Sequence, residues 1–231
     1  MSVALITGAS RGLGRALATA LAADGWALVL DARGEAALDE VARSLATTTI
    51  VRSVAGDVAD ADHRAALVAA AQELGQLDLL VNNASVLGPS PQPTLDRYPL
   101  DVLEMVYRVN VVAPLGVVQA ALPLLRPAHG VIVNITSDAG VEPYDGWGGY
   151  GSSKAALDQL SNILGAEEPE LRVYAFDPGD MRTQMHQEAF PGEDISDRPE
   201  PETVVPALVR LVHDRPASGR YRASDFAAVS S

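Results

Sequence analysis

The chain has 231 residues, of which 48% are hydrophobic and 20% are charged, and its formal net charge is −13. This composition is typical of a folded globular protein, and the length favours one domain spanning residues 1–231. The negative charge opposes nonspecific binding to nucleic acid or anionic membranes, and the lack of cysteine excludes disulfides, thiolate nucleophiles and cysteine-ligated zinc.

Short β-branched runs alternate along the chain with longer Ala- and Leu-rich stretches of helical periodicity. The runs predict strands at Val3–Thr7, Ala27–Ala32, Ile50–Val54, Leu77–Val81, Gly130–Thr136 and Leu171–Phe176, with a weaker one around Gly219–Ala223. The stretches predict helices at Leu13–Ala23, Glu35–Ala46, Ala61–Leu74, Leu100–Leu125, Tyr150–Gly165 and Glu202–His213. Because apolar strands alternate strictly with helices, we expect an α/β fold with a doubly wound parallel sheet and helices on both faces.

The first predicted strand leads into a glycine-rich turn, from which a helix starts at once: Thr7-Gly8-Ala9-Ser10-Arg11-Gly12-Leu13-Gly14. Glycines let the backbone turn tightly and approach a pyrophosphate, whose charge is attracted to a helix N-terminus. On its own, the G-x-x-x-G-x-G spacing could simply reflect tight packing. Its position at the first strand–helix junction favours a dinucleotide site.

Three features bear on location and metal binding. The chain enters a strand by Val3, which leaves no room for a signal peptide, so we expect a cytoplasmic protein. No apolar run reaches the roughly 18 residues of a membrane helix, and the richest stretch, Val111–Leu125, reads as a buried or subunit-facing helix. The histidines show no metal-ligand spacing, so no metal is expected at His63, His129, His186 or His213.

The predicted helix Tyr150–Gly165 carries Lys154, the only lysine among 17 basic residues. Positions four apart share a helix face, so the Lys154 ammonium is expected beside the Tyr150 phenol. A neighbouring cation favours the phenolate and lowers the tyrosine pKa, which makes Tyr150 a candidate general acid/base. The alternative is a solvated lysine that happens to follow a tyrosine.

Three segments are expected to be non-helical loops at the carboxyl ends of the strands, where such sheets bind ligands: 88–93, 138–149 and 179–201, the last as a lid over the substrate. Residues near or within them form the expected substrate pocket, although about half could be ordinary lid packing. They are Val86, Leu87, Tyr144, Trp147, Met181, Met185 and Phe190, with His186 and Asp180 as polar groups.

With the glycine turn and the Tyr150/Lys154 pair together, the chain resembles the single-domain short-chain dehydrogenases/reductases over nearly its whole length. Further motifs match: Asn82-Asn83-Ala84, Asn110 in Arg108-Val109-Asn110, Ser137 placed 13 residues before Tyr150, and Pro178-Gly179 followed by Thr183. Taken singly, Asn110 and Ser137 could be satisfied buried polar groups. The resemblance implies a Rossmann-like fold and a catalytic tetrad of Asn110, Ser137, Tyr150 and Lys154.

In the mechanism that the resemblance implies, hydride passes between the nicotinamide and a carbonyl carbon while Tyr150 exchanges a proton with the oxygen. Ser137 polarises that oxygen, Lys154 lowers the Tyr150 pKa and binds the nicotinamide ribose, and Asn110 holds a water that relays protons. The substrate is a medium-sized ketone, aldehyde or secondary alcohol, held by Ser137, Tyr144, Trp147, Tyr150, Met185 and His186.

The resemblance also implies the cofactor contacts. They are Gly8, Ser10, Arg11, Gly12, Leu13, Gly14, Arg33, Asp57, Val58, Asn83, Ala84, Tyr150, Lys154, Pro178, Gly179, Met181 and Thr183. Asp57 would contact the adenine, although it could instead cap the following helix.

Cofactor choice depends on the end of the second strand, where an acidic side chain selects NAD and an arginine accommodates the 2′-phosphate of NADP. Counting back from Leu38, the family's acidic position falls on Ala32 and its arginine on Arg33. Asp31 then faces the other side of the sheet. With Arg11 as a second cation, the segment predicts NADP; a slip of one residue would favour NAD.

The chain departs from the family pattern at Ser85, which replaces a glycine, and in its short tail, which lacks Asp-Gly-Gly and puts the family's tetramer contact in question. The apolar helix Leu100–Leu125 predicts a homodimer at least, with the choice between dimer and tetramer left open.

A non-catalytic dinucleotide-binding sensor or scaffold on the same fold is the alternative function. The retained tetrad argues against it, because such proteins typically lose one of those residues.

Overall fold

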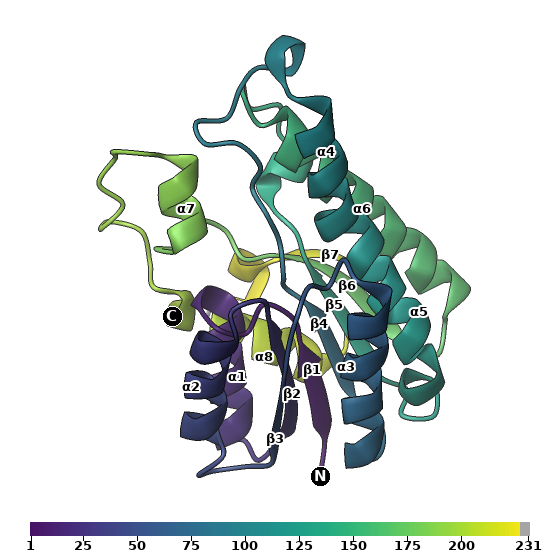
Figure 1. The fold of residues 1–231 in the computed structure, drawn as a ribbon. Coiled ribbons are helices and arrows are strands. Elements are labelled where there is room, and N and C mark those ends of the chain that lie inside the picture. Colours follow the sequence, from purple (N-terminus) through teal and green to yellow (C-terminus); the bar gives the residue numbers. More distant parts are fainter. Residues whose placement is uncertain (227–231) are drawn as a thin grey trace, which may run out of the picture.

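A computed structural model describes residues 1–226, and a parallel seven-stranded sheet runs through its centre (Figure 1). The strand order is β3-β2-β1-β4-β5-β6-β7, so the chain crosses over between β1 and β4 and leaves a crevice there, where such sheets bind ligands. The strands are β1 (Val3–Ile6), β2 (Ala27–Ala32), β3 (Val51–Ala55), β4 (Leu79–Asn82), β5 (Val131–Ile135), β6 (Arg172–Asp177) and β7 (Gly219–Arg222).

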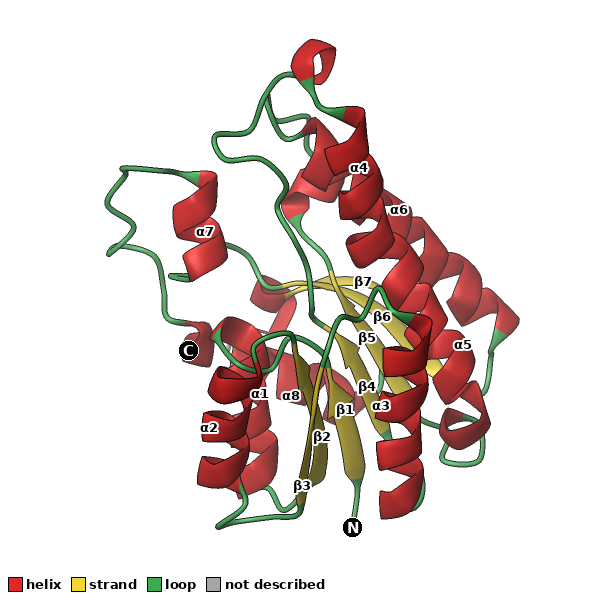
Figure 2. Ribbon diagram, in the orientation of Figure 1, coloured by secondary structure: helices red, strands yellow, loops and turns green. Residues whose placement is uncertain are grey.

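Helices cover both faces of the sheet (Figure 2), which confirms the predicted doubly wound fold. One face packs against α1 (Gly12–Ala23), α2 (Glu35–Leu45) and α8 (Val205–Asp214). The other packs against α3 (Ala61–Leu74), α5 (Ala113–Leu125) and α6 (Gly148–Glu167), the last mainly on β6.

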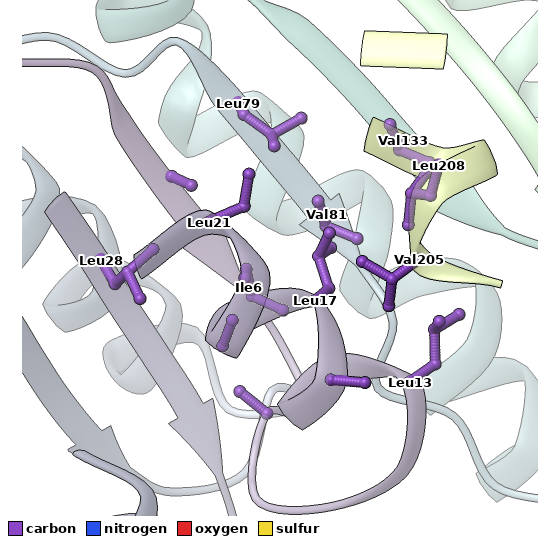
Figure 3. Close-up of a cluster of buried hydrophobic side chains, with 14 of the residues drawn as sticks. Ile6, Leu13, Leu17, Leu21, Leu28, Leu79, Val81, Val133, Val205 and Leu208 are labelled. Carbon is purple, nitrogen blue, oxygen red and sulfur yellow. The ribbon is translucent and has the colours of Figure 1, made fainter. Parts of the chain in front are cut away.

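Strand alternation divides the apolar side chains of the sheet between two cores. In β1, Ala4 and Ile6 join one core while Val3 and Leu5 join the other, and all four are almost fully buried. The close-up in Figure 3 shows Ile6 and Val81 of the sheet beside Leu17 of α1. Each such side chain stabilises the fold by about 1.5–3 kcal/mol when buried.

The predicted helix Leu100–Leu125 consists of α4 (Leu100–Tyr107), a π-helical turn over Arg108–Val112, and α5. By length and composition alone it could cross a membrane, with a mean hydropathy of 1.5. In the structure, α5 packs on α3 and the sheet, and Asn110 of the π turn hydrogen bonds the loop after β4. The segment is therefore a structural helix of this fold.

Two predicted boundaries need correction. The segment 179–201, predicted to be non-helical, contains α7 (Gln184–Ala189), because the Thr183 hydroxyl caps it by accepting from the His186 N–H at 3.1 Å. The last predicted helix is a 3₁₀ turn at Pro201–Thr203 followed by α8. Further 3₁₀ turns lie at Leu95–Arg97, Asp138–Gly140 and Ala223–Phe226. The end of the tail falls outside the described residues.

The turn between β1 and α1 depends on a close backbone contact at Gly14. A Cβ atom there would lie 2.4 Å from the Gly8 carbonyl oxygen and 2.6 Å from Asn83 Nδ2. Gly34, at the start of α2, has open space around the same position and a φ of −86°.

We therefore expect Gly14→Ala to lower the free energy of unfolding by about 1–3 kcal/mol, because the added methyl overpacks the turn. Urea denaturation followed by circular dichroism measures this. The control Gly34→Ala should stay within about 0.5 kcal/mol of the parent. Equal stability of the two variants would contradict the packing role of Gly14.

Candidate active site

A cavity of about 1220 Å³ lies at the carboxyl ends of the strands. The glycine turn after β1 lines one part of it, and Tyr150 and Lys154 of α6 line another. All the predicted substrate contacts and all but one of the predicted cofactor contacts line it. Two of the predicted site residues do not line the cavity. Gly14 packs closely against Gly8 and Asn83 in the glycine turn, and Asn110 lies behind the residues that line the cavity.

Hydrogen bonds join the ends of β1 and β4 beneath the glycine turn. Asn83 donates from Nδ2 to the carbonyl oxygens of Thr7 and Gly8, at 2.9 and 3.0 Å. The Thr7 hydroxyl oxygen accepts from the N–H groups of Asn83 and Ala84, both at 3.0 Å. These four bonds fix the turn that faces the cavity.

The N-terminus of α1 opens into the cavity through Gly12, whose φ of +54° favours glycine. The residue before it, Arg11, caps no α1 N–H with its side chain in the described structure, and the first helical turn holds no acidic side chain. Free N–H groups and the helix dipole suit an anionic group such as a pyrophosphate. The glycine turn therefore fits a dinucleotide.

Asp31 in β2 and Arg33 just after the strand have different surroundings. Asp31 is 1% exposed; its carboxylate lies 2.7 Å from His63 Nε2 and accepts from the Gly8 N–H at 3.4 Å. Burial raises the pKa of Asp31, although His63 opposes the rise. Arg33 is exposed, and both Asp31 and Arg33 line the cavity. Asp31 thus contacts α3, on the opposite face of β2 from Ala32, as the strand alternation predicts.

The cap of α3 is Asp60, whose carboxylate accepts from the Asp62 N–H at 2.9 Å. Asp57 accepts from the Ala59 N–H instead and lines the cavity. The alternative in which Asp57 caps this helix is therefore wrong.

Tyr150 and Lys154 lie side by side on α6, with the Lys154 Nζ 5.3 Å from the centre of the phenol ring. Both are buried, and Nζ donates to the Ile135 carbonyl oxygen at 2.8 Å. The alternative of a solvated lysine is wrong, because Lys154 is only 2% exposed.

The expected lowering of the Tyr150 pKa is also wrong. Burial raises the pKa of Tyr150 well above its usual value, and the carboxylates of Asp177 and Asp138 add to the rise, while the Ser85 hydroxyl opposes it. Burial likewise lowers the pKa of Lys154 to about 8, against the opposing effect of Asp158. Removal from water is thus the largest cause of both shifts.

Asn110 has all four hydrogen-bonding positions of its side chain occupied by protein groups. Its Oδ1 accepts from the Val86 N–H at 2.9 Å and from the Ser85 hydroxyl at 3.1 Å. Its Nδ2 donates to the Val86 carbonyl at 2.9 Å and to the Ser153 hydroxyl at 3.0 Å. The side chain thus positions the loop after β4, and a water held by Asn110 would have to use its main-chain carbonyl.

An ion-pair network beneath the site was not predicted from the sequence. Arg220 of β7 lies 3.0 Å from the carboxylates of both Asp158 on α6 and Asp177 at the end of β6. It also donates to the Ser137 carbonyl oxygen at 3.1 Å. The network therefore fixes the ends of β5 and β6 and places a carboxylate one helical turn from Lys154. The only signal for it was the four-residue spacing between Lys154 and Asp158.

Aromatic side chains form one wall of the cavity. Of the chain's six tyrosines, three phenylalanines and two tryptophans, four line it: Tyr144, Trp147, Tyr150 and Phe190. The Trp147 ring lies 5.8 Å from Tyr150 and 5.9 Å from Phe190 between centroids. His186 packs on Phe190 at 4.9 Å and lies 3.8 Å from the Asp180 carboxylate.

Two curated proteins resemble the chain over most of its length. Sepiapterin reductase from Mus musculus is 34% identical over 200 residues, which cover 80% of this chain and 77% of that protein. Benzil reductase ((S)-benzoin forming) from Saccharomyces cerevisiae is 37% identical over 195 residues, covering 80% of this chain and 74% of the relative.

Solved structures resemble the fold closely. An oxidoreductase from E. coli superposes with a TM-score of 0.90 at 30% identity, covering 96% of this chain and 94% of the other. An alcohol dehydrogenase from Thermococcus sibiricus, complexed with 5-hydroxy-NADP, superposes with a TM-score of 0.83 at 28% identity, covering 96% and 95%. The family model for short chain dehydrogenases matches residues 2–194. The chain therefore belongs to the short-chain dehydrogenases/reductases and is an oxidoreductase of that family.

Proposed function

We propose that this protein is an NADP-dependent reductase of ketones or aldehydes, with Tyr150 as the general acid. The observation that carries the proposal is a buried tyrosine–lysine pair in the same cavity as the glycine turn. The raised pKa of Tyr150 keeps the phenol protonated at neutral pH, which suits proton donation to a carbonyl oxygen.

The protein's own groups position the substrate and move the proton. When bound, the cofactor supplies the hydride. The Tyr150 O–H bond breaks and its proton goes to the carbonyl oxygen, leaving a phenolate. Ser137 donates a hydrogen bond to the same oxygen once its hydroxyl turns from Asp138, to which it now donates at 3.0 Å. The Lys154 ammonium stabilises the phenolate and is the group expected to hold the nicotinamide ribose.

The substrate pocket favours an aromatic or otherwise planar carbonyl compound. Trp147 and Phe190 offer ring faces and edges next to Tyr150, and Met185 packs on the same cluster. The names of two relatives, sepiapterin reductase and benzil reductase, support testing sepiapterin and benzil first. The segment 179–201, which contains α7, Met185, His186 and Phe190, is the proposed lid over this pocket.

NADP is the proposed cofactor because of the charges at the end of β2. Arg33, Arg11 and Asp31 all line the cavity, but the Asp31 carboxylate is buried and paired with His63. An acidic side chain that is already paired is poorly placed to select the ribose diol of NAD. The complex of the Thermococcus sibiricus relative with 5-hydroxy-NADP supports the same choice.

A dinucleotide-binding sensor remains the second candidate, because fold alone does not establish catalysis. The buried Lys154 argues against it. Its charge is costly to hold away from water, and binding alone gives no reason to place it beside a phenol.

Lys154→Arg tests the proposed pair. We expect a 10²- to 10⁴-fold loss of kcat/KM with benzil or sepiapterin and NADPH, because a planar guanidinium cannot replace a compact ammonium beside Tyr150. NADPH absorbance measures the rate. The control Arg43→Lys makes the reverse exchange on the exposed face of α2 and should keep full activity. A Lys154→Arg enzyme with more than half the parental activity would contradict the assigned role.

Cofactor preference can be read from kcat/KM values with NADPH and NADH. Two arginines at the 2′-phosphate should give NADPH at least a tenfold advantage, since charge-assisted hydrogen bonds contribute about 1.5–3 kcal/mol each. Arg33→Ala should weaken NADPH binding and leave NADH binding nearly unchanged, while Arg43→Ala on α2 should alter neither. A parental preference for NADH would overturn the proposal.

The helical segment of α4 and α5 is proposed to pair two copies of the chain across a two-fold axis. Met105 and Val112 on this segment and Ile163 on α6 remain 39%, 56% and 44% exposed. We expect light scattering to show at least a dimer at micromolar concentration.

Val112→Glu should dissociate this assembly, because it places a charge in an apolar contact. Val141→Glu is the matched control: Val141 is equally exposed, at 56%, but lies in the loop after β5. A monomeric parent protein would remove the claim.

A further inference from the structure

His63 and Asp31 form a largely buried pair at the end of β2, where the adenosine ribose of the cofactor is expected. The His63 Nε2 atom lies 2.7 Å from Asp31 Oδ1, and the two side chains are only 9% and 2% exposed. Asp31 lines the cavity, together with Arg33 two residues later, whereas His63 does not. The histidine therefore holds the carboxylate from the side away from the cavity.

The fold fixes both partners of this pair. His63 lies in the first turn of α3, which begins after the Asp60 cap. Its ring packs on the backbone that follows β3, because a Cβ atom on Gly56 would lie 2.3 Å from His63 Nδ1. The second carboxylate oxygen of Asp31, Oδ2, accepts from the Gly8 N–H at 3.4 Å. Both oxygens are thus engaged by the protein.

The His63 hydrogen bond keeps Asp31 in this orientation. Among the described residues, His63 is the only hydrogen-bond partner of Asp31 Oδ1. Without it, that oxygen would lie out of water with no donor, and a buried carboxylate without partners is unstable. The cavity lies on the other side of the Asp31 side chain, so a rotation toward it would restore hydration.

A carboxylate turned into the cavity would act on the two cofactors in opposite ways. It would accept hydrogen bonds from the ribose hydroxyls of NAD, as acidic side chains at the end of the second strand do in this type of fold. It would also repel the 2′-phosphate of NADP and compete with that phosphate for Arg33. The orientation of Asp31 therefore bears directly on cofactor preference.

We propose that His63 determines cofactor preference by keeping the Asp31 carboxylate turned away from the adenosine ribose. His63 is a positioning residue, because it acts through Asp31 rather than on the cofactor itself. The inference rests on the proposed binding of NADP, and it explains how an acidic residue in β2 is compatible with that choice. A pair that merely joins α3 to β2 would affect both cofactors alike.

The test measures the dissociation constants of NADPH and NADH by titrating the fluorescence of the reduced nicotinamide, which needs no turnover. We expect His63→Leu to lower the ratio of NADPH affinity to NADH affinity by about 10- to 100-fold, because the freed carboxylate gains a charged hydrogen bond to the ribose diol. His63→Gln keeps an N–H donor at the position of Nε2 and should retain the parental ratio.

Two further variants isolate the carboxylate. Asp31→Asn alone should leave the ratio unchanged, because the carboxylate is already withheld from the ribose. In the His63→Leu background, Asp31→Asn should return most of the lost ratio, because an amide carries no charge. The matched control His213→Leu removes an exposed histidine of α8 that lies 3.3 Å from Asp214, and it should alter neither constant.

Equal losses of affinity for both cofactors in His63→Leu, at an unchanged ratio, would overturn the proposal, because a merely structural pair predicts them. A rise of about tenfold in the ratio for Asp31→Asn alone would also overturn it, since Asp31 would then already act on the cofactor. If His63→Leu does not fold, His63→Asn takes its place: its amide corresponds to Nδ1 and falls short of Asp31.

The parent protein tests the proposed cofactor separately. A parental preference for NADH, with the ratio falling further in His63→Leu, would overturn the choice of NADP and leave the role of His63 standing. A parental preference for NADPH that His63→Leu does not change would overturn the role of His63 and leave the choice of NADP standing.

Discussion

Lys154 holds an ammonium group almost completely out of water, at 2% exposure, under the carboxyl ends of the strands. A buried cation is stable only when it is hydrogen-bonded and faces opposite charge. The Ile135 carbonyl supplies the hydrogen bond, and Asp158 supplies the charge one helical turn away. Asp158 is in turn paired with Arg220, which also holds Asp177. Positive and negative side chains therefore alternate from Lys154 through Asp158 to Arg220 on the edge strand β7.

This network connects the edge of the sheet to the chemistry. Arg220 comes from β7, the last strand, yet it donates to the carbonyl of Ser137. Strand β7 thus does more than close the sheet, because it fixes the residue expected to polarise the substrate. Burial raises the Tyr150 pKa and lowers that of Lys154, so under the proposed function the pair is a neutral acid beside a cation at neutral pH.

The sequence predicted the sheet and the position of the glycine turn well, because apolar strands and a glycine-rich junction are local patterns. It missed what depends on three-dimensional surroundings. The neighbouring charge of Lys154 was visible from its spacing, but the burial that reverses the pKa shift of Tyr150 was not. Arg220 and Asp158 are 62 residues apart, so no local pattern could pair them. The six-residue α7 is too short for a periodic signal, and the π turn at Asn110 interrupts a helix whose apolar pattern continues through it.

Transfer of hydride from the cofactor to a carbonyl carbon is the claim on which this account depends. It is tested most directly with NADPH carrying deuterium at the transferred position of C4, incubated with benzil, sepiapterin and simple ketones, with the products examined by mass spectrometry. The account predicts an alcohol with one deuterium on the former carbonyl carbon. NADPH that binds but is consumed with none of these carbonyls would contradict it and favour a sensor; an alcohol without the label would contradict direct transfer.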